Sequence, residues 1–198
     1  MVNEGYSKIA RNTFALYIRM AITMLLSFFS TRITLQVLGA EDYGLNNLVS
    51  SVVALFSFLN GSMGTAVQRF YSIEIGKAKE SNLDRIFGSA LSLHMIVALV
   101  TCILMEMFAV FFLHKLNIPA ERILAAKAVF QISILSMLMN VIIVPYSALL
   151  RAREEFSQIA VAEVLQSAGR LVVVLILTHI TYDHLIALGC LNLLVTVL

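Results

Sequence analysis

The chain has 198 residues, of which 60% are hydrophobic and 13% are charged, and its formal net charge is +2. A soluble domain of this length is expected to be about half apolar and about a quarter charged, so the composition excludes an ordinary water-soluble protein. The excess of apolar surface requires lipid as the solvent, and we expect no nucleic-acid partner.

Six apolar segments follow one another along the chain. They cover about residues 13–38, 45–72, 86–113, 120–150, 156–180 and 184–198. Each meets or approaches the roughly 20 residues that a helix needs to cross a bilayer. The connectors between them are short and polar. We therefore predict an all-α integral membrane protein, a bundle of about six transmembrane helices in which the sixth is incomplete at Leu198, and we expect the natural protein to continue beyond it.

Lysine and arginine are distributed unevenly between the two sets of connectors. With a cytoplasmic N-terminus, seven basic residues lie on inner flanks and two on outer flanks: Lys8, Arg11, Lys77, Lys79, Arg85, Arg151 and Arg153 against Lys115 and Arg122. Basic residues concentrate in the cytoplasmic loops of membrane proteins. The bias predicts a multi-pass protein whose N-terminus is cytoplasmic.

Polar residues form stripes along three of the predicted helices. The stripes are Arg19, Thr23, Ser27, Ser30 and Thr34 in the first segment, Asn46, Ser50, Ser57, Gly61, Gly64 and Gln68 in the second, and Glu163, Gln166, Ser167 and Arg170 in the fifth. Spacings of three and four place residues on one face of a helix. The stripes predict a shared polar cavity, although the small residues of the second could equally mark tight helix packing.

Several charged residues are expected deep in the membrane: Arg19, Arg32, Glu106, Lys127, Glu163 and Arg170, with Arg69 nearer the inner face. A charge at the bilayer centre costs about 2.5–3.5 kcal/mol, so each needs a partner. Similar depth predicts structural ion pairs between Arg19 and Glu163 and between Glu106 and Lys127.

This pairing leaves Arg32 and Arg170 unpaired, and a transported anionic group would supply their partner. We therefore take as candidate substrate-binding residues Arg19, Arg32, Gln68, Arg69, Ser167 and Arg170.

The sequence contains no recognisable catalytic or metal-binding constellation. The four histidines and the two cysteines, Cys102 and Cys190, lack the spacing of metal ligands, so we expect no cofactor and no metal. Pro145 removes one backbone hydrogen bond from the fourth segment and can kink it, either as a passive bend or as a hinge.

Three stretches resemble the polysaccharide-export, or O-antigen flippase (Wzx-like), branch of the multidrug/oligosaccharidyl-lipid/polysaccharide (MOP) transporter superfamily. They are RITLQVLGAEDYGL at 32–45, GTAVQRFY at 64–71 and PYSALLRAREEF at 145–156. Local chemistry agrees with the resemblance, because Gly39 and Gly44 permit a tight turn between antiparallel helices. Asp42 could accept backbone N–H bonds at the start of the second helix.

The resemblance implies a MATE/MOP-like N-terminal lobe, the first of two six-helix bundles around a central cavity. It implies a transporter, not an enzyme, in the bacterial inner membrane. The implied substrate is an undecaprenyl-diphosphate-linked oligosaccharide, flipped from the inner to the outer leaflet for surface polysaccharide (O-antigen, capsule or lipopolysaccharide) biosynthesis. The implied partners are this lipid-linked oligosaccharide, membrane lipid and other polysaccharide-assembly proteins.

Three alternatives stay open. The first is a cation-coupled multidrug exporter of the same superfamily, although the net positive buried charge suits organic cations poorly. The second is a membrane-embedded polysaccharide polymerase or glycosyltransferase, for which the short connectors leave little room. The third is an inactive truncated fragment.

Overall fold

The computed structural model describes residues 2–77, 82–112 and 118–197; the side chains of 2–12, 15, 57–60, 112 and 120 lie outside this description. Its elements are α1 (Val2–Ile75), α2 (Leu83–Phe112), the 3₁₀ turn η1 (Ala120–Arg122), α3 (Ile123–Ala152), α4 (Phe156–Leu177) and α5 (His184–Val197). No strand occurs in the described ranges. The prediction of an all-α bundle is confirmed.

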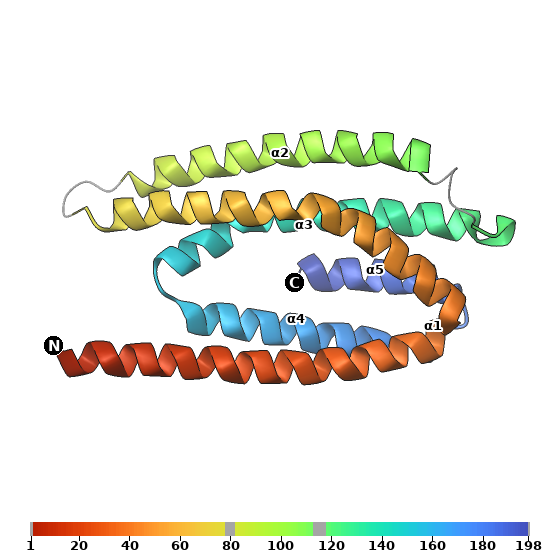
Figure 1. Cartoon of the computed structure of the whole chain (residues 1–198), viewed down its shortest axis with the longest axis horizontal. Helices are drawn as coiled ribbons and strands as arrows, with labels where there is room; N and C mark the ends of the chain where they lie inside the picture. Colours follow the sequence, from red (N-terminus) through yellow and green to blue (C-terminus); the bar gives the residue numbers. More distant parts are fainter. Residues whose placement is uncertain (1, 78–81, 113–117, 198) are drawn as a thin grey trace.

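Helix α1 consists of two limbs that fold back on each other at Gly39 (Figure 1). Gly39 has φ 73° and ψ 174°, a backbone conformation that is essentially restricted to glycine. The first limb (residues 2–38) and the second limb (residues 40–75) correspond to the first two predicted segments. The expected turn over 39–44 is shorter than predicted, because Gly44 is helical and Gly39 alone makes the reversal.

The helices form two layers that meet at one end of the bundle (Figure 1). The second limb, α2 and α3 form one layer, the first limb packs along α4 in the other, and α5 lies between them. The layers meet where α1 reverses, here called the Gly39 end, and diverge toward the N-terminal end.

Two buried clusters explain why the layers diverge. The larger cluster lies toward the Gly39 end and joins all five α-helices, with Val52, Met105, Phe130, Val174 and Leu185 among its buried members. The smaller cluster lies toward the N-terminal end and is built from Val67, Tyr71, Ala90 and Ala148. These four residues belong to the second limb, α2 and α3, so the smaller cluster holds one layer together without joining it to the other.

Four described stretches are long and apolar enough to cross a bilayer: Leu16–Phe56, which runs through Gly39, Leu83–Phe111, Ile123–Ala152 and Phe156–Leu177. Their outer faces expose large apolar side chains such as Leu99 and Leu165, as expected for helices surrounded by lipid. The apolar α5, with 14 residues, is shorter than a full span. The chain is a multi-pass membrane protein.

The turn between α1 and α2 is fastened by the buried carboxylate of Glu74. Lys77 Nζ donates to Glu74 Oε2 at 2.6 Å, and the Asn82 backbone N–H donates to Oε1 at 2.7 Å. These two bonds hold the pKa of the Glu74 carboxyl below its usual value, the Lys77 bond having the larger effect. Of the connector charges used to predict orientation, Lys79 and Lys115 and the side chains of Lys8 and Arg11 lie outside the described part of the chain.

Candidate functional site

One face of α4 carries both charged and apolar residues, and their burial shows where that face points. Glu163, Ser167, Arg170, Val174 and Leu177 follow one another at spacings of four and three, so they share a face. Val174 and Leu177 are 2% and 0% exposed, whereas Glu163 and Arg170 are exposed. Arg170 therefore lies on the inner face of α4, at a level where the layers have begun to separate.

The charges near this face form one ion pair and leave one cation with an amide partner. Arg19 Nη1 of the first limb lies 2.8 Å from Glu163 Oε2, so this predicted pair is present. Ser167 Oγ donates to the Glu163 carbonyl oxygen at 2.8 Å. Arg170 Nη2 donates to Gln166 Oε1 at 3.4 Å. Among the residues that the structure describes, Arg170 has no carboxylate partner.

The other predicted substrate-binding residues lie elsewhere. Arg32 is exposed, and its separation from Arg19 places it about 220° around the first limb, on a different face. Gln68 is partly buried and Arg69 is exposed, both on the second limb. The structure thus brings together Arg19, Glu163, Ser167 and Arg170, but no hydrogen bond or ion pair joins Arg32, Gln68 or Arg69 to them within the described ranges.

The predicted pair between Glu106 and Lys127 is not among the ion pairs of the described residues. Gln131 Nε2 donates to Glu106 Oε2 at 3.1 Å, while Lys127 is exposed and forms no ion pair with any described residue. Gln131 lies one helical turn beyond Lys127 on α3, so the packing of α2 against α3 is displaced by a turn from the register that equal depth suggested. Pro145 is buried within a continuous α3.

A polar pocket of about 260 Å³ lies between the second limb, α3 and α5. It is lined by Asn46, Ser50, Val53, Val129, Ile132, Ser133, Ser136, Met137, Asn140, Gly189 and Asn192. Three asparagines and three serines provide hydrogen-bond donors and acceptors, and none of the lining residues is charged. The pocket therefore suits a neutral ligand rich in hydroxyl or amide groups.

The polar stripe predicted on the second limb divides into two parts. Asn46 and Ser50 line the polar pocket. Gly64 packs against α3, because a Cβ there would lie 3.1 Å from Val144 Cγ1. The cavity and the packing interpretations thus each hold for part of the stripe, and the Ser57 side chain lies outside the description.

The α3 and α5 walls of the pocket were not predicted. Ser133, Ser136 and Asn140 recur at spacings of three and four, which is the signal that identified the other stripes. Asn192 on α5 had no comparable pattern around it. The Ser133 and Ser136 hydroxyls donate to carbonyls one turn earlier, at 2.7 and 3.0 Å, which leaves their oxygen lone pairs as acceptors.

A second charged group, the Arg122 cluster, closes the bundle at the Gly39 end. Arg122 Nη2 lies 2.8 Å from Asp42 Oδ2, and Arg122 Nη1 lies 2.8 Å from Asp183 Oδ2. The other oxygen of Asp183 accepts the backbone N–H groups of Leu185 and Ile186 at the start of α5. Asp42 does not cap the second limb as expected; its Oδ2 binds Arg122 and its buried Oδ1 has no partner in the described structure.

Comparison with known proteins identifies the family. A family model described as MatE matches residues 15–176. The chain belongs to the MatE family. The match runs from the first limb through nearly all of α4, and it makes the chain a membrane transporter of the MOP superfamily. No curated protein and no solved structure matches the chain. In this MatE protein, the inner face of α4 and the polar pocket are the candidate elements of the transport pathway.

Proposed function

We propose that this MatE protein is part of a flippase that moves an undecaprenyl-diphosphate-linked oligosaccharide from the inner to the outer leaflet of the bacterial inner membrane. The observation that carries the proposal is Arg170, a cation on the inner face of α4 whose described partner is an amide. The nearest carboxylate on that face, Glu163, is already paired with Arg19. Arg170 is therefore available to an anionic group.

A diphosphate matches this arrangement chemically. It must cross a region of low dielectric constant, where an ionised group without a partner is costly. Arginine offsets that cost by charge-assisted, often bidentate, hydrogen bonds to phosphate oxygens. In this proposal Arg32 and Arg69 extend the cationic path, while Gln68 and Ser167 add neutral hydrogen-bonding groups.

The polar pocket supports the saccharide part of the proposed substrate. Sugar hydroxyls both donate and accept hydrogen bonds, as asparagine side chains do. An organic cation would instead be favoured by carboxylates, and none lines this pocket. These features favour the lipid-linked oligosaccharide over the multidrug alternative, which the family match accommodates equally well.

The test is transport by the purified transporter that contains this chain, reconstituted in proteoliposomes with a fluorescent lipid-diphosphate sugar. Arg170→Ala is expected to slow flipping by about tenfold or more, because hydrogen bonds to charged groups contribute about 1.5–3 kcal/mol. Arg170→Lys should retain part of the activity, since it keeps the charge but loses the planar fork. Arg153→Ala, an exposed residue between α3 and α4, is the matched control.

Flipping at the wild-type rate by folded Arg170→Ala would refute the role of Arg170. Efflux of an organic cation by the wild-type protein, without flipping of the lipid-linked sugar, would assign the transporter to the multidrug branch. The amount of folded protein, measured by size-exclusion chromatography, separates either outcome from a loss of structure.

A further inference from the structure

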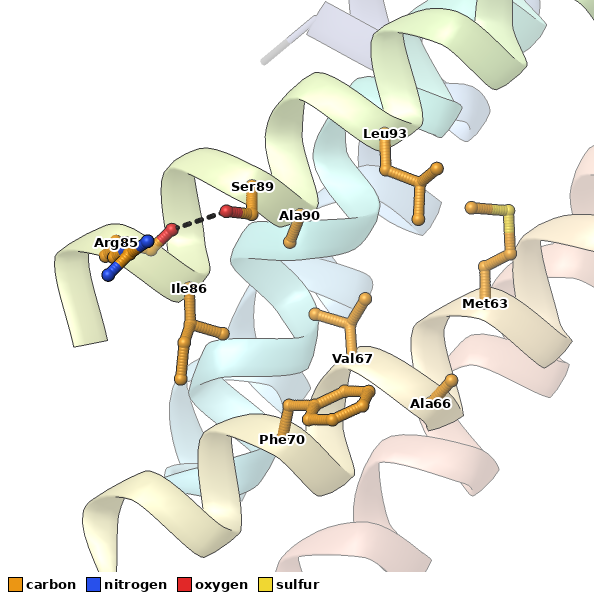
Figure 2. Close-up of a pocket in the computed structure, with 9 residues that line it drawn as sticks. All are labelled: Met63, Ala66, Val67, Phe70, Arg85, Ile86, Ser89, Ala90 and Leu93. Atoms are coloured by element: carbon orange, nitrogen blue, oxygen red, sulfur yellow. Dashed lines mark hydrogen bonds between the residues drawn. The ribbon is translucent and has the colours of Figure 1, made fainter. Parts of the chain in front are cut away.

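An apolar groove lies on the outside of the bundle between the second limb and α2 (Figure 2). Val67 and Phe70 form one wall, and Ile86, Ala90 and Leu93 form the other; its volume is about 400 Å³. Phe70 and Leu93 are 62% and 49% exposed. The groove is therefore open toward the surrounding lipid and separate from the polar pocket, with which it shares no lining residue.

Arg85 lies at the end of the groove nearest the start of α2 (Figure 2). Among the described residues Arg85 forms no ion pair. The Glu74 carboxylate, which is bonded to the backbone just before α2, is occupied by Lys77 and by the Asn82 N–H. The hydroxyl of Ser89, the other polar lining residue, donates to the Arg85 carbonyl oxygen at 2.9 Å. The groove thus combines an apolar body with one cationic end.

The position and length of the groove match one leaflet of a bilayer. Arg85 is the third residue of α2, so its side chain lies at a helix end, where membrane meets water. From Arg85 to Leu93 the groove follows α2 for about 12 Å. One leaflet of hydrocarbon is about 15 Å deep. A lipid whose phosphate contacts Arg85 would therefore lay most of an acyl chain along the groove.

We propose that this groove binds an anionic glycerophospholipid, with one acyl chain between the second limb and α2 and the headgroup phosphate on Arg85. The lipid comes from the leaflet on the side of the N-terminus, since α1 ends and α2 begins on that side (Figure 1). With a cytoplasmic N-terminus this is the leaflet in which anionic lipids attract basic residues. This lipid site does not depend on which substrate the transporter moves.

The experiment uses the absence of tryptophan from this chain. Phe70→Trp places a single fluorophore in the groove, and Leu99→Trp places one on the exposed face of α2 outside it. The 198-residue chain is reconstituted in phosphatidylcholine containing a minor fraction of lipid with brominated acyl chains, which quench tryptophan. At equal fractions, brominated phosphatidylglycerol is expected to occupy the Phe70→Trp site about 5-fold more than brominated phosphatidylcholine, equivalent to about 1 kcal/mol for one basic residue.

The Leu99→Trp protein should show no such preference. Adding Arg85→Gln should abolish the preference at Phe70→Trp, while Arg85→Lys should retain part of it. Leu93→Trp on the opposite wall serves as a second reporter if Phe70→Trp does not fold. Equal quenching by both lipids at the groove, or a preference that survives Arg85→Gln, would overturn the proposal. A polyprenyl phosphate is then added in an amount equimolar with the brominated lipid. If it displaces the brominated lipid from the groove and excess phosphatidylglycerol does not, the proposal is also overturned and the groove is assigned to a prenyl lipid.

Discussion

At the Gly39 end, one guanidinium holds two carboxylates that come from distant parts of the sequence. Asp42 is 5% exposed and has one oxygen without a partner, so its charge depends on Arg122. Removing one member of a buried ion pair leaves an uncompensated charge, which typically costs about 3–5 kcal/mol. Arg122 itself is partly exposed, so the cost here is expected at or below the lower end of that range.

We therefore expect Arg122→Ala to destabilise the protein by up to about 3 kcal/mol, measured as a lower midpoint of thermal unfolding in detergent. Asp42→Asn in the same chain should recover part of the loss, because a neutral amide costs less to bury unpaired. Arg151→Ala, which removes an exposed arginine bonded to Ser147 of its own helix, is the control and should stay within about 0.5 kcal/mol of wild type. Equal effects from the two arginine variants would contradict the assignment.

At the residue scale, one of the two predicted ion pairs is present in the described structure and the other is not among its ion pairs. Arg19 and Glu163 lie on helices that pack side by side, and their depths agree. Glu106 also faces the helix that was expected, but it contacts Gln131 instead of Lys127. Depth along a helix axis is known only to about a turn, and the register of two packed helices depends on side-chain shapes that a single sequence does not reveal.

At the scale of elements, the reversal of α1 rests on a single backbone conformation. A Cβ at Gly39 would meet nothing within 4 Å, but φ +73° is unfavourable for any residue with a side chain. A Cβ at Gly44 also meets nothing, and Gly44 is helical. The two glycines thus differ in backbone conformation and not in the space around them.

Gly39→Ala is expected to lower stability by about 1–3 kcal/mol, because its dihedral angles are essentially limited to glycine. Gly44→Ala should be neutral or stabilising by up to about 1 kcal/mol, since alanine is favoured over glycine inside a helix. Chemical unfolding of the two variants in detergent measures both changes. A stability loss at Gly44 as large as that at Gly39 would mean that space, and not backbone conformation, limits this turn.

The helix boundaries were largely predictable, because long apolar runs separated by short polar connectors permit few other arrangements. Five predicted segments, 45–72, 86–113, 120–150, 156–180 and 184–198, begin and end close to the bounds of the second limb, α2, α3, α4 and α5. Only one of the three elements that form the polar pocket was predicted: Asn46 and Ser50 belong to the stripe of the second limb, whereas no polar stripe was predicted on α3 or α5. The identity of a transported molecule depends on how such elements converge, so it is the property that a sequence predicts least well.

At the scale of the whole molecule, the layered bundle still needs an orientation in the membrane. In a chain carrying Cys102→Ala and Cys190→Ala, we expect Arg153→Cys to be shielded from an impermeant thiol reagent in intact cells. Tyr182→Cys, at a position that is 84% exposed, should be labelled, because the α4–α5 connector lies on the opposite side from the α3–α4 connector. The reverse labelling pattern would place the N-terminus outside.

The Arg122 cluster also has a consequence for how the protein is made. Asp42 precedes Arg122 by 80 residues, and Asp183 follows Arg122 by 61. At about 5–20 residues per second, a ribosome needs about 4–16 s to add the residues between Asp42 and Arg122. During that time the ribosome completes the second limb of α1, but Asp42 still lacks its partner. The Asp42 carboxylate must therefore stay in water. The Gly39 end, although it contains an early part of the chain, can be completed only after synthesis reaches Asp183.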